Sequence, residues 1–289
     1  MKCINAIFAV AATTVLSGCC MFGPKTPEAS LHKGLKSEGF WTRVHAAEHM
    51  IDVDLDKKLI EELFLADEKA NPEETYCRVG RHRVLIRLGN NVDERMKRLH
   101  EIAFNENSED RIHAVETLGK LGWTATGEDE KVLIAIRSDK SLDDGLRYFS
   151  AWVDDTKDIE RETFLTSGCI DSVKPHFNAI RGVNGLRFMK EISLEQTYII
   201  LQMVANNESY SSSLRLVAVE LLLRDKKMNF DEALNLYAKL KKDNAAKGQW
   251  CRILAFFAPK EMAELELNKF LKSGDIELSM SAAWGLLKL

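Results

Sequence analysis

The residues with the clearest potential for chemistry are two histidines and a glutamate near the start of the chain. They form the segment His45-Ala46-Ala47-Glu48-His49, which fits the pattern H-x-x-E-H. Histidines four residues apart lie on one face of a helix, where both can bind one zinc ion, and the glutamate between them can act as a general base. The pattern is typical of zinc hydrolases. A working site also needs a third ligand from a distant segment, and the sequence identifies none.

The same segment also fits a repeated structural unit. His45 recurs as His113, and Glu48 recurs as Glu116 and Glu220, in segments that lack the second histidine. No G-x-S-x-G, P-loop or dinucleotide-binding pattern is present elsewhere. We therefore rank a zinc hydrolase third among the functional hypotheses, and we predict a protein that is not an enzyme, with no metal site and no cofactor.

A second candidate site is a row of arginines at equivalent positions of this unit. Guanidinium groups bind carboxylates and sulfates through paired hydrogen bonds, and neighbouring aromatic rings can stack on sugars. In the structural alternative, each arginine pairs with an acidic residue of an adjacent turn or unit and the aromatic packs at the helix start. We favour the structural alternative, because residues shared by repeats usually hold the stack together. The candidate binding residues are Arg43, Arg78, Arg111, Arg215 and Arg252, with Trp41, Tyr76 and Trp250 two positions before three of them.

These residues recur because the chain repeats itself about every 34 residues. Three segments align without gaps: 43–48, 111–116 and 215–220, and weaker copies begin near residues 78, 145, 252 and 279. Apolar residues in each copy follow the spacing i, i+3, i+4, i+7 of a helix that buries one face. Further amphipathic segments lie between the copies, for example 92–104 and 230–240. The pattern predicts stacked pairs of antiparallel helices. Small residues that would allow close helix packing recur at Ala46, Ala114, Ala218 and Ala282.

The segment from Arg111 to Gly122 resembles the V-R-x-x-A-A-x-A-L-G core of bacterial HEAT repeats. The resemblance covers roughly residues 30–289 and is weakest at 172–191, where Gly182 and Gly185 stand and the arginine and alanine positions cannot be placed. It implies an all-α fold, a right-handed α-solenoid of about eight HEAT-like helix pairs. It also implies a concave groove that binds partners and performs no chemistry.

The N-terminus resembles the signal peptide of bacterial lipoproteins. Lys2 precedes an apolar run from Ile4 to Leu16, which ends in Leu16-Ser17-Gly18-Cys19. The resemblance implies cleavage before Cys19, which would then carry diacylglycerol and an N-acyl chain such as palmitate. The expected organisation is a signal peptide at 1–18, a lipidated Cys19 with a tether at 19–30, and a repeat domain at 31–289. The protein is then expected at the cell envelope, and at the outer membrane if the host has two membranes, because aspartate does not follow Cys19.

Composition narrows the class of partner. The chain has 40 basic and 44 acidic residues and a net charge of −4, which argues against a nucleic-acid partner. Its cysteines are scattered without a C-x-x-C pair, so they predict neither a disulfide framework nor a zinc ribbon.

The leading functional hypothesis is a non-catalytic scaffold lipoprotein that binds an envelope protein on its solenoid surface. The alternative is an accessory lipoprotein that binds an anionic or carbohydrate polymer through the arginine and aromatic row. At the C-terminus, an apolar patch predicts docking of a second copy or of an envelope partner, because exposed apolar patches usually mark interfaces. This patch consists of Leu278, Ala282, Leu286 and Leu289.

Overall fold

The computed structural model describes residues 26–72, 74–153, 159–170, 175–189 and 191–289, with the backbone alone at 76, 175 and 176. The predicted all-α class is confirmed: these residues form helices and no β-strand. The sixteen helices are α1 (Pro27–Leu35), α2 (Phe40–Asp52), α3 (Lys57–Ala70), α4 (Thr75–Arg87), α5 (Val92–Phe104), α6 (Arg111–Lys120), α7 (Glu128–Ser138), α8 (Asp144–Ser150), α9 (Ile159–Cys169), α10 (Pro175–Phe188), α11 (Glu195–Asn206), α12 (Ser212–Arg224), α13 (Phe230–Leu240), α14 (Asn244–Phe257), α15 (Lys260–Leu271) and α16 (Ile276–Lys288).

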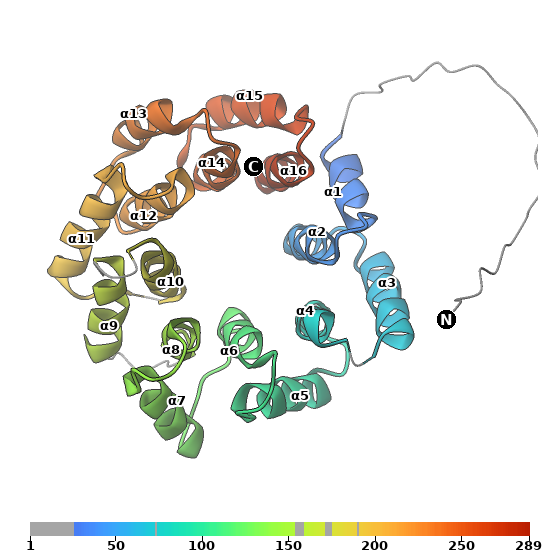
Figure 1. Ribbon diagram of the computed structural model, residues 1–289. Coiled ribbons are helices and arrows are strands. Elements are labelled where there is room, and N and C mark those ends of the chain that lie inside the picture. Colours follow the sequence, from blue (N-terminus) through green and yellow to red (C-terminus); the bar gives the residue numbers. More distant parts are fainter. Residues whose placement is uncertain (1–25, 73, 154–158, 171–174, 190) are drawn as a thin grey trace, which may run out of the picture.

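The helices form a closed ring rather than an open solenoid. The even-numbered helices, here called the inner helices, surround the centre, and the odd-numbered outer helices lie outside them (Figure 1). Each inner helix contacts the next one, and α16 contacts both α1 and α2. The predicted number of helix pairs agrees with this arrangement. The resemblance implied a concave groove; because the two ends of the array meet, this inner surface is enclosed.

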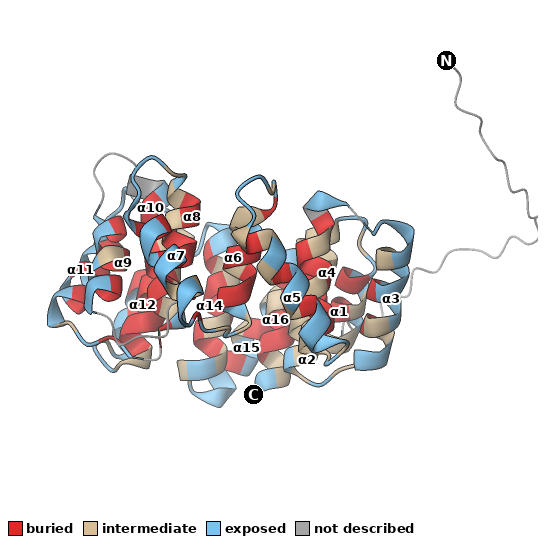
Figure 2. Cartoon of the chain, turned by 90° about the horizontal axis from the view of Figure 1, so that it is seen from below, coloured by how far each residue is buried: buried red, intermediate tan, exposed pale blue. Residues whose placement is uncertain are grey.

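The repeated segments lie in the inner helices, and the repeated alanines are fully buried. Ala46, Ala114, Ala218 and Ala282 are each 0% exposed. A larger side chain at these positions would push neighbouring helices apart. Figure 2 shows the buried residues concentrated where helices face one another.

The weakest repeat owes its divergent sequence to a close helix crossing. A Cβ atom placed on Gly182 of α10 would lie 2.3 Å from the carbonyl oxygen of Leu165 in α9. A Cβ atom on Gly185 would lie 2.5 Å from the Leu165 side chain and 2.6 Å from Trp152. The glycines allow α9 and α10 to approach more closely than any larger side chain at these two positions would allow.

The seam between α1 and α16 closes the ring. Leu31 and Leu35 of α1 are 0% and 1% exposed, and the hydroxyls of Ser30 and Ser279 lie 3.2 Å apart across the seam. On the neighbouring α2, Thr42 donates to Glu277 at 2.8 Å. α1 begins at Pro27, inside the segment that the sequence assigned to a tether.

The C-terminal patch is not free. Leu278 and Ala282 are buried, and Leu286 and Leu289 pack against the main hydrophobic core. The prediction of an unpartnered apolar end is wrong, because α1 returns to cover α16 in a way that local spacing does not reveal.

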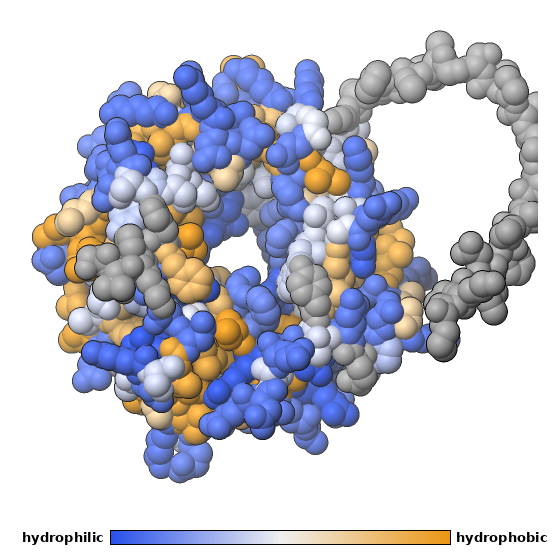
Figure 3. All heavy atoms as spheres, in the orientation of Figure 1, coloured by the Kyte–Doolittle hydropathy of each residue, from blue (hydrophilic) through white to orange (hydrophobic). Residues whose placement is uncertain are grey.

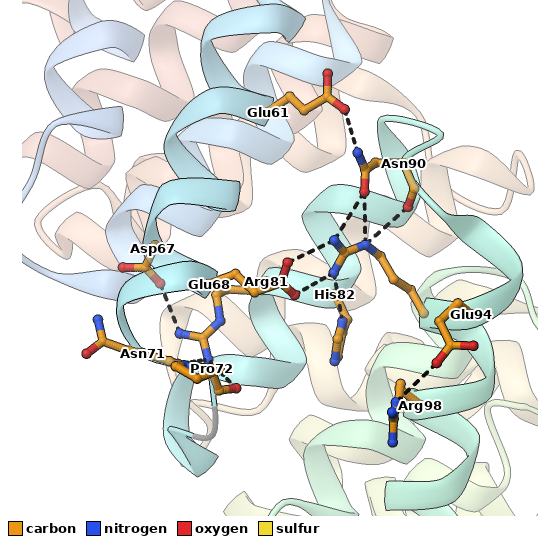
Figure 4. Close-up of polar contacts among 11 residues, drawn as sticks. Glu61, Asp67, Glu68, Asn71, Pro72, Arg81, His82, Asn90, Glu94 and Arg98 are labelled. Carbon is orange, nitrogen blue, oxygen red and sulfur yellow. Dashed lines mark hydrogen bonds and ion pairs between the residues drawn. The ribbon is translucent and has the colours of Figure 1, made fainter.

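Buried arginines join the outer helices α3 and α5 to each other and to the inner helix α4. Arg95 is 7% exposed and donates to both oxygens of Glu68, at 2.6 and 2.9 Å, and to Asn90 (Figure 4). Arg81 donates to Asp67 at 3.0 Å and to the Asn71 carbonyl at 2.6 Å. Each of these two guanidinium groups has an acidic partner, which offsets the free-energy cost of removing a charge from water.

The predicted signal peptide at 1–18 and the predicted lipidation site at Cys19 lie outside the described residues. Within the described residues, every helix is too short or too polar to span a bilayer.

Candidate functional site

The ring encloses a central channel with a volume of about 820 Å3. Figure 3 shows the opening at its centre, through which the far side is visible. Six inner helices (α2, α4, α6, α10, α12 and α14) contribute to its lining. The lining residues are Glu48, His49, Asp52, Arg83, Arg87, Lys120, Arg187, Phe188, Glu220, Leu221, Arg224, Arg252, Phe256 and Phe257.

The lining is positively charged although the whole chain is slightly acidic. It holds six arginines and lysines against three carboxylates, whereas the chain has 40 basic and 44 acidic residues. Two further carboxylates, Glu116 and Asp225, pair with Lys120 and Arg224 from outside the lining. With those two included, the cations still exceed the carboxylates by one (six against five). The channel therefore favours an anionic occupant.

Most of these cations come from the C-terminal ends of the inner helices. Arg87, Lys120 and Arg224 are the last residues of α4, α6 and α12, and Arg187 is one residue from the end of α10. Cations at these positions complement the helix dipole. A sequence signal for them exists: Arg87, Lys120 and Arg224 each stand nine residues after a repeat arginine. The sequence analysis missed these channel cations because it compared only the residues in the first turn of each repeated helix.

On the α2 and α4 side, the charges neutralise one another. Arg83 is 3% exposed and its Nε lies 2.8 Å from Glu48 Oε1. Arg87 lies between Glu48, at 3.7 Å, and Asp52. These contacts join α2 to α4, so this half of the lining is a structural ion-pair network.

On the α10, α12 and α14 side, one carboxylate serves two guanidinium groups. Glu220 of α12 is 8% exposed and accepts from Arg187 Nη2, at 3.0 and 3.1 Å, and from Arg252 Nη2, at 3.2 Å. Gln249 of α14 also donates to it. Arg252 Nε is buried without a hydrogen-bond partner among the described residues. Burial lowers the pKa of Arg187, the Glu220 carboxylate opposes this shift, and Arg252 adds to it. This half of the lining retains unsatisfied positive charge.

The predicted arginine row does not assemble at the channel. Three of its members, Arg43, Arg111 and Arg215, donate hydrogen bonds to backbone carbonyls. These carbonyls lie at the C-terminal end of the preceding outer helix or just after it. Arg43 donates to the carbonyls of Ser37 and Glu38, at 3.2 and 3.1 Å. Arg111 donates to Ala103 at 3.2 Å, and Arg215 donates to Ala205 at 2.9 Å. The last carbonyls of a helix have no partner within it, so these arginines satisfy them.

The remaining two arginines behave differently. Arg78 lies 2.6 Å from Asp110, and Arg252 lies 3.2 Å from Glu220. Arg43 also lies 3.2 Å from Asp67. These are the pairings with an acidic residue of an adjacent unit that the structural alternative anticipated. Arg252 alone among the five predicted arginines lines the central channel. Arg147 of α8 was passed over by the sequence reasoning, although it makes the same contact as Arg111, with the Arg137 carbonyl at 3.1 Å.

The predicted aromatic partners are not arranged for stacking on a ligand in the channel. Trp250 is 0% exposed and stacks on Tyr237, with ring centroids 4.3 Å apart. Trp41 is half-buried between Phe40 and the Arg83 guanidinium, which lies 5.7 Å from its ring. The side chain of Tyr76 lies outside the described part of the chain. Sequence spacing placed Trp41 at a helix start correctly, but Trp250 lies in the middle of α14, and spacing could not show which way either ring faces.

The segment 45–49 does not bring together a set of zinc ligands. His45 Nδ1 lies 3.4 Å from Glu277, Glu48 is held by Arg83, and the His49 ring lies 5.6 Å from the Trp284 ring. Among the described residues, no group of three or more His, Cys, Asp or Glu side chains is placed to hold a metal ion. The third ligand that the motif requires is not found there.

Burial of His49 gives a pH dependence that can be measured. Burial lowers its pKa from 6.5 to about 4. Between these values the unfolded chain binds a proton that the folded chain does not, so stability falls as pH falls from 6.5 towards 4. We expect this residue to account for at most about 3 kcal/mol of that loss. Urea denaturation across this range should show a shallower decline in His49→Gln, and equal slopes in the two proteins would contradict the assignment.

No protein family, curated protein or solved structure matches this chain.

Proposed function

We propose that the chain is a non-catalytic binding protein that holds an acidic segment of a partner protein in its central channel. The observation that carries this proposal is the single Glu220 carboxylate between Arg187 and Arg252, in a lining where cations exceed carboxylates. Because the two guanidinium groups share one carboxylate, a carboxylate from a partner would balance their charge, and charge-assisted hydrogen bonds from arginine are among the strongest available to a protein.

The composition of the lining supports binding rather than catalysis. The channel is lined by no serine, threonine or cysteine within the described residues. Desolvation lowers the pKa of its histidine, His49, to about 4, so this imidazole is a weak proton acceptor, and its ring packs near Trp284. Most of the charged groups are held by one another, and an enzyme would need a base free to accept a proton.

We further propose that the ring is tethered to the cell envelope by lipid on Cys19. Only a short segment separates Cys19 from α1, which begins at Pro27, so the seam of the ring would lie near the membrane. Cys19→Ala is expected to abolish labelling by a palmitate analogue and to release the protein from the membrane fraction. A variant that is still labelled and still membrane-bound would contradict the tether.

The binding proposal can be tested with a fluorescent peptide of alternating Glu and Ser residues. Its anisotropy should rise on addition of the purified chain, and the affinity should fall with added salt because the attraction is electrostatic. Arg252→Gln and Lys120→Gln should each weaken binding severalfold. The matched control is Arg98→Gln, which removes a positive charge from a side chain that is 60% exposed on the outer helix α5.

Equal binding by the channel variants and Arg98→Gln would place the peptide outside the channel. Equal binding of a Lys and Ser peptide would exclude charge recognition. Direct binding of labelled polygalacturonate, together with no binding of the acidic peptide, would favour the alternative of an anionic glycan polymer.

A further inference from the structure

Two phenylalanines are exposed inside the central channel. Phe188 at the end of α10 is 41% exposed, and Phe256 near the end of α14 is 53% exposed. Phe257 and Leu221 complete an apolar wall on the same side of the channel. Several outer helices also expose one or two large apolar residues each, which is normal for a protein surface. The wall differs because its members come from three inner helices and converge on one cavity.

The apolar wall adjoins the unsatisfied positive charge. Phe188 follows Arg187 in the chain, and Leu221 follows Glu220. The Arg252 guanidinium lies 5.7 Å from the Phe256 ring and 5.1 Å from the Trp284 ring. A group bound to Arg187 and Arg252 would therefore have apolar surface beside it. The two arginines and the apolar wall together suit a ligand that has an anionic group next to an apolar group.

We propose that the acidic segment held in the channel carries a large apolar side chain next to its carboxylates, and that Phe256 and Phe188 receive this side chain. The inference rests on the proposed binding of an acidic segment and adds the residue that gives it specificity. Arg187 and Arg252 select the charge, and the wall selects the neighbouring side chain.

A peptide fits this site in a way that a simple anion does not. In an extended peptide, side chains two residues apart lie on the same face, about 6.6 Å apart along the backbone, so a carboxylate and an apolar group at such positions can occupy neighbouring subsites. The opening through the ring lets both ends of a segment continue beyond it (Figure 3). The cavity of about 820 Å3 is comparable in size with pockets that enclose ligands of several hundred daltons.

The test compares two labelled peptides of equal charge, acetyl-Glu-Glu-Phe-Glu-Glu-amide and acetyl-Glu-Glu-Ser-Glu-Glu-amide. The purified chain should bind the Phe peptide about tenfold or more tightly, because burying a phenylalanine is worth at least that factor. Phe256→Ser should remove most of this preference and leave binding of the Ser peptide nearly unchanged. Leu265→Ser is the matched control, since Leu265 is 60% exposed on the outer helix α15.

Equal affinity for the two peptides would overturn the inference and leave the proposed function intact. Failure of both peptides to bind would overturn the proposed function as well. A preference for the Phe peptide that survives in both Phe256→Ser and Phe188→Ser would show that the wall does not receive the side chain. Because Phe256 is half-exposed, its variant should fold, which thermal melting monitored by circular dichroism would verify.

Discussion

Glu220→Gln is expected to lower the free energy of unfolding by about 3–5 kcal/mol and, at the same time, to tighten the binding of an acidic peptide. Glutamine keeps the shape of the side chain but removes the one carboxylate that Arg187 and Arg252 share. The two guanidinium groups then repel each other without a counter-charge, and an anion that enters the channel relieves that repulsion. Urea denaturation measures the first effect, and fluorescence anisotropy measures the second.

The matched control is Glu101→Gln on the outer helix α5. Glu101 is 49% exposed and lies 3.3 Å from Arg98, so its removal should change stability by no more than about 0.5 kcal/mol. It should also leave peptide binding unchanged. Lower stability of Glu220→Gln without a gain in affinity would show that the charge at this position serves the fold alone. Unchanged stability would contradict the role of Glu220 as the shared counter-charge.

The helices and their register could be predicted from the sequence because local physics controls them. An inner helix that packs against two neighbours needs a small residue where it crosses them, and Ala46, Ala114 and Ala218 mark that position in the sequence and in the structure. The same requirement explains the failure at α10. There the small residue is Gly182, where even the Cβ atom of an alanine would lie 2.3 Å from the Leu165 carbonyl oxygen, so the alanine pattern does not mark this helix.

The repeated arginines were recognised correctly as repeat residues, but their partners could not be read from spacing. Arg111 and Arg215 bind main-chain carbonyls, and every residue has a carbonyl, so no side-chain pattern identifies the acceptor. The cations of the channel were missed for a related reason. Arg187 and Arg224 lie at helix ends, where basic residues are common, and only their convergence at the centre of the ring distinguishes them.

Ring closure is a global property that no single segment encodes. Each helix pair turns slightly relative to the one before it, and whether the ends meet depends on the sum of these rotations. The apolar residues of α16 could thus be recognised as an interface, but the sequence could not show that α1 of the same chain covers it. The central channel exists only because of this closure, so the site that carries the proposed function lay beyond sequence reasoning.

The seam provides the strictest test of this architecture. Leu31→Ala and Leu35→Ala are each expected to lower the free energy of unfolding by about 2–5 kcal/mol, because both side chains are almost fully buried. α1 and α16 meet through non-covalent contacts alone, whereas consecutive helices around the rest of the ring are joined by the chain. The double variant should therefore open at the seam before it unfolds elsewhere.

Small-angle X-ray scattering should then report a larger radius of gyration, and binding of the acidic peptide should weaken as the channel loses its enclosure. Leu63→Ala, at a side chain that is 39% exposed on α3, should leave the radius of gyration and binding unchanged. A double variant that keeps the wild-type radius of gyration and stability would show that the ring is closed by contacts other than those of α1.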